Sequence, residues 1–221
     1  QTSVCFDTET TGIDANNAEL VGLSFSFEVG KAYYVPVSSN FESAKATTHL
    51  FKDVLENASI KKIGQNIKYD ILILKWYGIE VAGELFDTML AHYLIDPDTR
   101  HGMDVLAENY LGYTPVSITE LIGKKGKNQG NMRDVEIEIV KEYAAEDADI
   151  TLQLEQVFAP LLADVNAEQL AKEIENPLVY VLADMEIEGV RIDMEQLQNY
   201  SKELEIEVNR LEKSVNEKAG V

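Results

Sequence analysis

Four carboxylates stand inside otherwise apolar segments of this 221-residue chain, and they restrict how the chain can fold. Asp7 and Glu9 lie in one segment, Asp70 in a second, and Asp147 in a third. An ionised carboxylate removed from water costs several kcal/mol unless a partner charge or a metal compensates it. Because three separate segments carry this cost, we expect the fold to bring them together at one cation site.

The spacing of the first two acids predicts that they share a face. Val4–Phe6 begins an apolar, β-branched pattern typical of a strand, and side chains alternate along a strand. Asp7 and Glu9 therefore point one way, while Thr8 points the other way. Adjacent like charges repel, and a divalent cation removes the conflict. Two solvated acids at a strand end remain the alternative.

The third segment has the period of a helix. Its apolar stripe contains Ile139, Val140, Tyr143, Ala144, Asp147, Ile150, Thr151 and Leu154. Asp147 lies in the middle of this stripe, one turn after Tyr143 on the same face, whereas Asp149 falls off it and is expected to be solvated. Asp70 lies early in a helix that begins near Asn66. Its alternative role is a favourable interaction with the helix N-terminus, worth about 0.3–1 kcal/mol.

Carboxylates without a His or Cys cluster favour Mg²⁺ or Mn²⁺ over zinc. Two such ions about 3.5–4 Å apart form the known arrangement for in-line attack on a phosphodiester. A tyrosine hydroxyl one turn from Asp147 is placed to orient the attacking water. Its ordinary pKa near 10 makes it a poor general base, so we expect Tyr143 to position the water.

Composition narrows the classes of partner. No apolar run reaches the roughly 20 residues that span a bilayer, and one cysteine, Cys5, excludes an internal disulfide and is expected to be a packed thiol. A net charge of −20 argues against broad electrostatic binding of nucleic acid. The local exception is the Gly-rich loop 123–133, which has four basic residues and no acid. It is either a solvated flexible loop or an arm that contacts phosphate.

The order of elements predicts an α/β layered fold, in which an antiparallel meander precedes alternating helices and short strands. The expected strands are 4–6 with its extension, 20–27, 32–37 and 62–64, with a hairpin at 28–31; the expected helices are 47–57, 66–77 closed by Gly78, 87–95, 103–111, 134–162 and 167–188. Pro177 should kink or divide the last of these helices.

Beyond this point, 189–193 is expected to form a turn and a short strand, with Asp193 capping a final helix. That helix has a narrow apolar seam at spacings of three and four, formed by Leu197, Tyr200, Leu204, Val208, Leu211 and Val215. We expect the seam to pack against further sequence, because the chain begins and ends like a fragment of a longer one.

Three segments resemble the exonuclease motifs of bacterial DNA polymerase I, in the tyrosine-containing branch of the four-carboxylate (DEDD) exonucleases. They are Phe6–Thr10 (FDTET), Gly64–Asp70 (GQNIKYD) and Tyr143–Asp149 (YAAEDAD). Further matches are 86–90, 100–104, 126–129, 176–179 and 189–193. The resemblance covers nearly the whole chain, and the last two matches resemble the start of a polymerase domain.

The resemblance implies a ribonuclease-H-like fold, with a mixed sheet flanked by helices and followed by a helical extension. It divides the chain into an exonuclease domain at 1–163 and the start of a polymerase domain, with truncated thumb helices, at 164–221. It implies two-metal 3′–5′ removal of nucleotides from a DNA 3′ end, which is proofreading, with no polymerase activity in this fragment. The remaining partners are the palm, the fingers and a possible 5′ nuclease domain of the same chain, in a monomer that works in the bacterial cytoplasm and associates with the nucleoid.

Carried over by position, the resemblance assigns metal binding to Asp7, Glu9, Asp70 and Asp147, and water orientation to Tyr143. Glu9 would also contact that water or the terminal 3′-hydroxyl. The positions matching contacts to the frayed strand are Thr10, Ile13, Asn66, Tyr69 and Arg100, with Ile13 in place of a leucine wedge. A base-stacking aromatic of the family is absent, because Ile118 or Thr119 stands there. The rival functions are a ribonuclease D-like exoribonuclease and a non-catalytic scaffold domain of a polymerase.

Overall fold

The computed structural model describes residues 2–220, and the chain divides into two compact units at the boundary between Ile187 and Glu188. The first unit is built on a five-stranded sheet of β1 (Ser3–Thr10), β2 (Leu20–Glu28), β3 (Lys31–Pro36), β4 (Lys61–Gly64) and β5 (Leu85–Asp87). The strand order is β3-β2-β1-β4-β5; β1, β2 and β3 pair antiparallel, while β4 and β5 run parallel to β1 and to each other. The expected mixed sheet with an antiparallel meander is confirmed.

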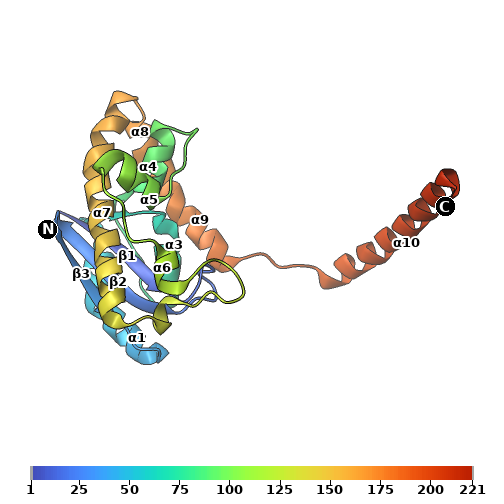
Figure 1. Cartoon of the computed structure of the whole chain (residues 1–221), viewed down its shortest axis with the longest axis horizontal. Coiled ribbons are helices and arrows are strands. Elements are labelled where there is room, and N and C mark those ends of the chain that lie inside the picture. The colour runs from blue at the N-terminus through green and yellow to red at the C-terminus, as the bar shows by residue number, and fades with distance from the viewer. Residues whose placement is uncertain (1, 221) are drawn as a thin grey trace. The chain divides into compact units, whose positions relative to one another are not determined.

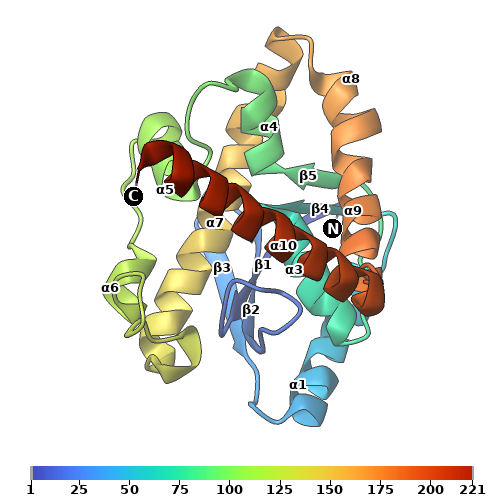
Figure 2. The same ribbon diagram turned by 90° about the vertical axis from the view of Figure 1, so that its right-hand side faces the viewer.

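Helices cover both faces of the sheet (Figures 1 and 2). In chain order they are α1 (Phe41–Thr48), η1 (His49–Phe51), α2 (Lys52–Leu55), α3 (Ile67–Trp76), α4 (Thr88–Ile95), α5 (Met103–Leu106), η2 (Ala107–Leu111), α6 (Ile118–Ile122), η3 (Met132–Asp134), α7 (Ile137–Asp164), α8 (Glu168–Leu170), η4 (Ala171–Glu175) and α9 (Asn176–Glu188). The long helix α7 packs across β1, β2 and β3.

Alternation along β1 separates two cores. Val4 and Phe6 belong to the cluster that includes Ile71 of α3 and Ala183 of α9. Cys5 points to the opposite face and packs with Leu152 of α7. It is a fully buried free thiol, as expected. Residues 5, 7 and 9 therefore face α7, whereas residues 4, 6 and 8 face α3.

Several local expectations were wrong. The helix expected at 47–57 begins at Phe41, because Asn40 caps its first turn and accepts a hydrogen bond from Ser43 N (3.0 Å). The sequence pattern predicts neither β5 nor α6, because their three and five residues are too few to show a period. Residues 189–193 form no strand. The break expected near Pro177 is confirmed, because the π-helical turn η4 ends immediately before α9.

The second unit contains α10 (Met194–Ala219). Asp193 caps this helix as expected, accepting a hydrogen bond from Gln196 N (3.0 Å). The apolar seam of α10 is solvent-exposed within the described unit. No helix formed by residues 2–220 is both long and apolar enough to cross a membrane.

A buried lysine ties the loops at one end of the sheet together. Lys62 is fully buried, and its Nζ donates to the backbone oxygens of Asn57 (2.6 Å), Ile60 (2.8 Å) and Ala82 (2.6 Å). Burial lowers the pKa of Lys62 to about 8. No sequence signal distinguishes it from the adjacent Lys61, which forms an ion pair with Glu155.

We expect Lys62→Met to lower the free energy of unfolding by about 3 kcal/mol, because three carbonyl oxygens lose their donor inside the protein. Urea unfolding measures this change. Lys61→Met is the matched control, and it should cost about 1 kcal/mol or less because its ion pair is partly exposed. Equal losses for the two variants would contradict the role given to Lys62.

Candidate active site

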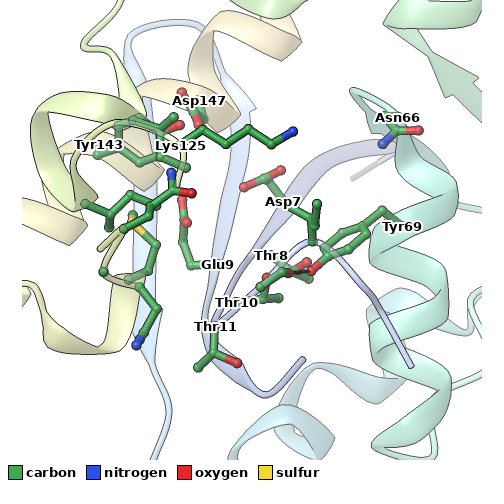
Figure 3. Close-up of a pocket in the computed structure, with 18 residues that line it drawn as sticks. Asp7, Thr8, Glu9, Thr10, Thr11, Asn66, Tyr69, Lys125, Tyr143 and Asp147 are labelled. Carbon is green, nitrogen blue, oxygen red and sulfur yellow. Dashed lines mark hydrogen bonds between the residues drawn. The ribbon is translucent and has the colours of Figure 1, made fainter. Parts of the chain in front are cut away.

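Three of the four predicted carboxylates meet at one point. Asp7 and Glu9 point from β1 toward α7, and Asp147 comes from the middle of α7 (Figure 3). Each offers an oxygen, and these three oxygens lie within 4.8 Å of one another. The structure therefore brings together the acids that strand spacing predicted in β1 and the acid that helical spacing predicted in α7.

The carboxylate cluster is costly for the protein alone. Glu9 Oε1 and Asp147 Oδ1 are buried without a hydrogen-bond partner. Burial raises the pKa of Asp7 to about 7, and burial together with the charge of Asp7 raises the pKa values of Glu9 and Asp147 well above their usual range. Orphaned hard oxygen donors at this separation fit a divalent cation, which would compensate the charge they share.

Asp70 is not a member of this group of three, because Thr8, which alternates with Asp7 and Glu9 along β1, holds it on the other face of the strand. Thr8 points to the α3 face of β1, and both its backbone N (2.9 Å) and its Oγ1 (2.5 Å) donate to Asp70 Oδ1. Burial and the neighbouring charge of Asp7 raise the pKa of Asp70. Asp70 therefore adds a fourth buried carboxylate, which interacts with Asp7 from the other face of the strand.

Tyr143 lies one turn before Asp147, as the helical spacing predicts. Burial and the adjacent carboxylates, first that of Asp147, hold the pKa of Tyr143 well above its usual range. A hydrogen bond from the hydroxyl offsets part of the rise in the pKa of Asp147. The phenol therefore stays protonated at neutral pH. It can orient a water molecule through a hydrogen bond, but it cannot act as a general base.

The carboxylates line a cleft with a volume of about 590 Å³. Four of the five predicted strand-contacting residues also line it: Thr10, Ile13, Asn66 and Tyr69. Ile13 is 89% exposed at its rim. Ile118, in the place of the missing aromatic, lines the cleft as well. Arg100 does not; it is exposed in the loop before α5.

Asn66 is held in a backbone conformation that few residues other than glycine adopt (φ 56°). Asp87, at the end of β5, accepts hydrogen bonds from Asn66 N (3.1 Å) and Ile67 N (2.8 Å), and it also caps α4 through Met89 N (2.8 Å). Asn176 Oδ1 accepts from Asp87 N (3.2 Å). One carboxylate therefore fixes the start of α3, which carries Asn66, Tyr69 and Asp70.

Sequence reasoning missed Thr8 and Asp87 as supports of the site, and it missed the hydrogen-bond partner of Asp149. Asp149 is half-buried and accepts a hydrogen bond from Gly30 N in the β2–β3 hairpin (2.7 Å). It fastens α7 to the hairpin. Asp87 had a visible signal, because an Asp directly before a helical segment is a typical N-cap.

Residues 1–163 match the family model described as 3′-5′ exonuclease. The chain belongs to the 3′–5′ exonuclease family of DNA polymerase I. The DNA polymerase I of Rhizobium leguminosarum is 38% identical over 98% of this chain and 24% of that protein. The exonuclease chain thus spans about a quarter of the length of this curated relative.

Two solved structures share the fold of this exonuclease. One is described as the POL domain of Pol1 from M. smegmatis in complex with DNA primer-template and dNTP; it has a TM-score of 0.75 and 20% identity, over 96% of this chain and 33% of that one. The other is Brucella melitensis NrnC with bound Mg²⁺, with a TM-score of 0.69 and 21% identity, over 85% and 86% of the two chains.

The raised pKa of Asp7 predicts how stability depends on pH without divalent cations. Its folded pKa of about 7 exceeds the ordinary 3.8, so the folded state holds more protons than the unfolded state between these values. The stabilisation that comes from this tighter proton binding is complete below about pH 3.8 and is lost as pH rises through 7. In EDTA, the thermal midpoint of the wild-type chain should therefore fall more steeply from pH 5 to 8 than that of Asp7→Asn.

Divalent cations should reverse this trend, since they bind ionised carboxylates. Adding Mn²⁺ should raise the thermal midpoint of the wild-type chain more at pH 8 than at pH 5. Parallel pH profiles for the wild type and Asp7→Asn in EDTA would show that Asp7 does not carry the effect.

Proposed function

We propose that this chain hydrolyses phosphodiester bonds at the 3′ end of single-stranded or frayed DNA with the help of two divalent cations, Mg²⁺ or Mn²⁺. The observation that carries the proposal is the convergence of Asp7, Glu9 and Asp147, with two of their buried oxygens unpaired. A stable fold gains nothing from such an arrangement, whereas a metal-dependent nuclease requires it.

In this proposal Asp7, Glu9, Asp70 and Asp147 hold the cations. Bound cations would lower the pKa of the attacking water and stabilise the charge on the leaving oxygen. Tyr143 donates its hydroxyl hydrogen bond and so fixes the direction of the water. Glu9, buried between β1 and α7, contacts the water or the terminal 3′-hydroxyl.

The lining of the cleft supports a single-stranded substrate. Ile13 would present its exposed apolar side chain to the terminal base. Asn66 and Tyr69 line one side of the cleft together (Figure 3). The hydroxyl of Tyr69 is hydrogen-bonded to Thr10 Oγ1 (2.5 Å), which keeps its ring in place. Arg100 would reach the strand only beyond the cleft.

The relatives support a proposal about the wider setting. We place the chain within a bacterial DNA polymerase I, as a monomeric, cytoplasmic proofreading part that meets the nucleoid during replication and repair, next to palm and fingers and a possible 5′ nuclease domain. The family match ends at residue 163, which supports an exonuclease domain at 1–163 and the start of the polymerase domain at 164–221. The compact unit continues to Ile187, so α9 packs with the exonuclease core.

The test uses a single-stranded DNA oligonucleotide labelled at its 5′ end. With Mg²⁺, the label should move through successively shorter products, and EDTA should stop the reaction. A 3′-terminal phosphorothioate linkage should delay the first cut. In a parallel reaction with an oligonucleotide labelled at its 3′ end, labelled products that shorten stepwise from the 5′ end would contradict the proposed direction.

An RNA oligonucleotide of the same sequence separates the rival exoribonuclease from the proposed function. The proposal expects DNA to be degraded faster; faster degradation of RNA would favour the ribonuclease D-like alternative. A scaffold domain should degrade neither, and calorimetric titration with Mn²⁺ should then detect no site that depends on Asp7 and Asp147.

A further inference from the structure

One basic side chain reaches into the acidic cleft. Among the described residues that line it, Lys125 alone carries a positive charge. Figure 3 shows its side chain extending across the cleft, from the side of Tyr143 and Asp147 toward the side of Asn66. None of the ion pairs formed within residues 2–220 involves Lys125.

The loop between α6 and η3 holds Lys125 at this place. Gly130 N donates to Ile122 O (2.8 Å), and Gln129 Nε2 donates to Gly123 O (3.3 Å), which closes the base of the loop. Gly123 has a positive φ of 83°, so the chain turns as α6 ends. Gln129 and Gly130 line the cleft with Lys125, whereas Lys124 and Lys127 do not.

The charge balance of the cleft calls for such a group. Asp7, Glu9 and Asp147 repel a phosphodiester, and the overall charge of −20 adds to this repulsion. Cations bound to the carboxylates would offset part of it at the scissile phosphate only. A lysine that extends into the cleft from the loop supplies a flexible point charge for an adjacent phosphate.

We propose that Lys125 binds a backbone phosphate of the single strand beside the carboxylate cluster, and that its loop is the substrate-side wall of the cleft. The inference rests on the proposed function and adds one residue to it. Of the two alternatives for the basic loop, it favours the phosphate-contacting arm, and it confines the contact to one lysine.

The test compares Lys125→Gln with Lys127→Gln, which removes the same charge from the same loop outside the cleft. With saturating Mg²⁺ and single-stranded DNA, Lys125→Gln should raise KM about 5–10-fold, as expected for one lost phosphate contact of about 1–1.4 kcal/mol. The kcat should change less than KM. The KM of Lys127→Gln should stay within about twofold of the wild-type KM. Lys125→Arg keeps the positive charge, so its KM should return most of the way to the wild-type value.

The dependence of kcat/KM on salt concentration tests the charge of Lys125 directly, because a purely structural role for this residue would leave that dependence unchanged. The slope of log(kcat/KM) against log salt concentration should become shallower by about 0.7 in Lys125→Gln only. Equal slopes for both Gln variants would overturn the inference, as would an unchanged KM. Fluorescence anisotropy of labelled single-stranded DNA should show the same difference in slope without turnover, in the Asp7→Asn background.

These outcomes separate the two proposals. If the wild-type chain degrades DNA and Lys125→Gln behaves like the wild type, only the role of Lys125 is rejected. A wild-type chain that degrades no nucleic acid rejects the proposed function, and the anisotropy comparison then still decides whether Lys125 binds phosphate.

Discussion

Asp7→Ala is expected to lower kcat/KM on single-stranded DNA by at least about 10³-fold, a loss of roughly 4 kcal/mol of transition-state stabilisation. Burial raises the pKa values of Glu9, Asp70 and Asp147 most, and the charge of Asp7 is the largest electrostatic contribution to each rise. Its removal should weaken cation binding at every position. A 5′-labelled oligonucleotide under single-turnover conditions measures the loss.

The same substitution should have the opposite effect on stability in EDTA. Removing Asp7 relieves repulsion within the cluster, so the free energy of unfolding should rise by about 1 kcal/mol. Asp53→Ala, at an exposed position in α2, is the matched control and should change neither quantity. If Asp7→Ala unfolded the protein in EDTA, its loss of activity would say nothing about metal binding.

Asp87→Ala is expected to lower the free energy of unfolding by about 4 kcal/mol and to reduce activity as well. The carboxylate accepts hydrogen bonds from four backbone N–H groups, which are those of residues 66, 67, 89 and 90. Burial raises the pKa of Asp87, although these four donors oppose the shift. Without the carboxylate, the starts of α3 and α4 lose their caps together.

Urea unfolding, with kcat/KM measured well below the transition, separates the two effects of Asp87→Ala. Asp87→Asn keeps one acceptor oxygen, so it should cost less than half as much. Asn176→Ala removes the acceptor for Asp87 N and should produce a smaller loss of the same kind. A fully stable Asp87→Ala variant would contradict this view of how α3 is fixed.

Local periodicity predicted the centre of the site. Alternation in β1 placed Asp7 and Glu9 on one face, and the 3.6-residue period of α7 placed Tyr143 and Asp147 on another face that meets it. Both arguments concern neighbours within one element, where the backbone fixes the direction of each side chain. The main strands and the long helix followed from the same periods.

Contacts between distant segments could not be predicted in this way. The hydrogen bonds of Thr8 to Asp70 and of Asp87 to Asn176 join positions 62 and 89 residues apart. The strand β5 has three residues, and Arg100 lies in a loop whose course no pattern fixes. Family resemblance supplied the DNA 3′ end, which spacing and charge alone do not specify.

The most direct measurement is anomalous diffraction from a crystal of this chain soaked with Mn²⁺ and a short single-stranded DNA oligonucleotide. The account predicts Mn²⁺ in coordination contact with Asp7, Glu9 and Asp147, a second Mn²⁺ within reach of Asp70, and the 3′ end of the oligonucleotide in the cleft. Mn²⁺ bound only at exposed surface acids, in a preparation that degrades DNA, would contradict it.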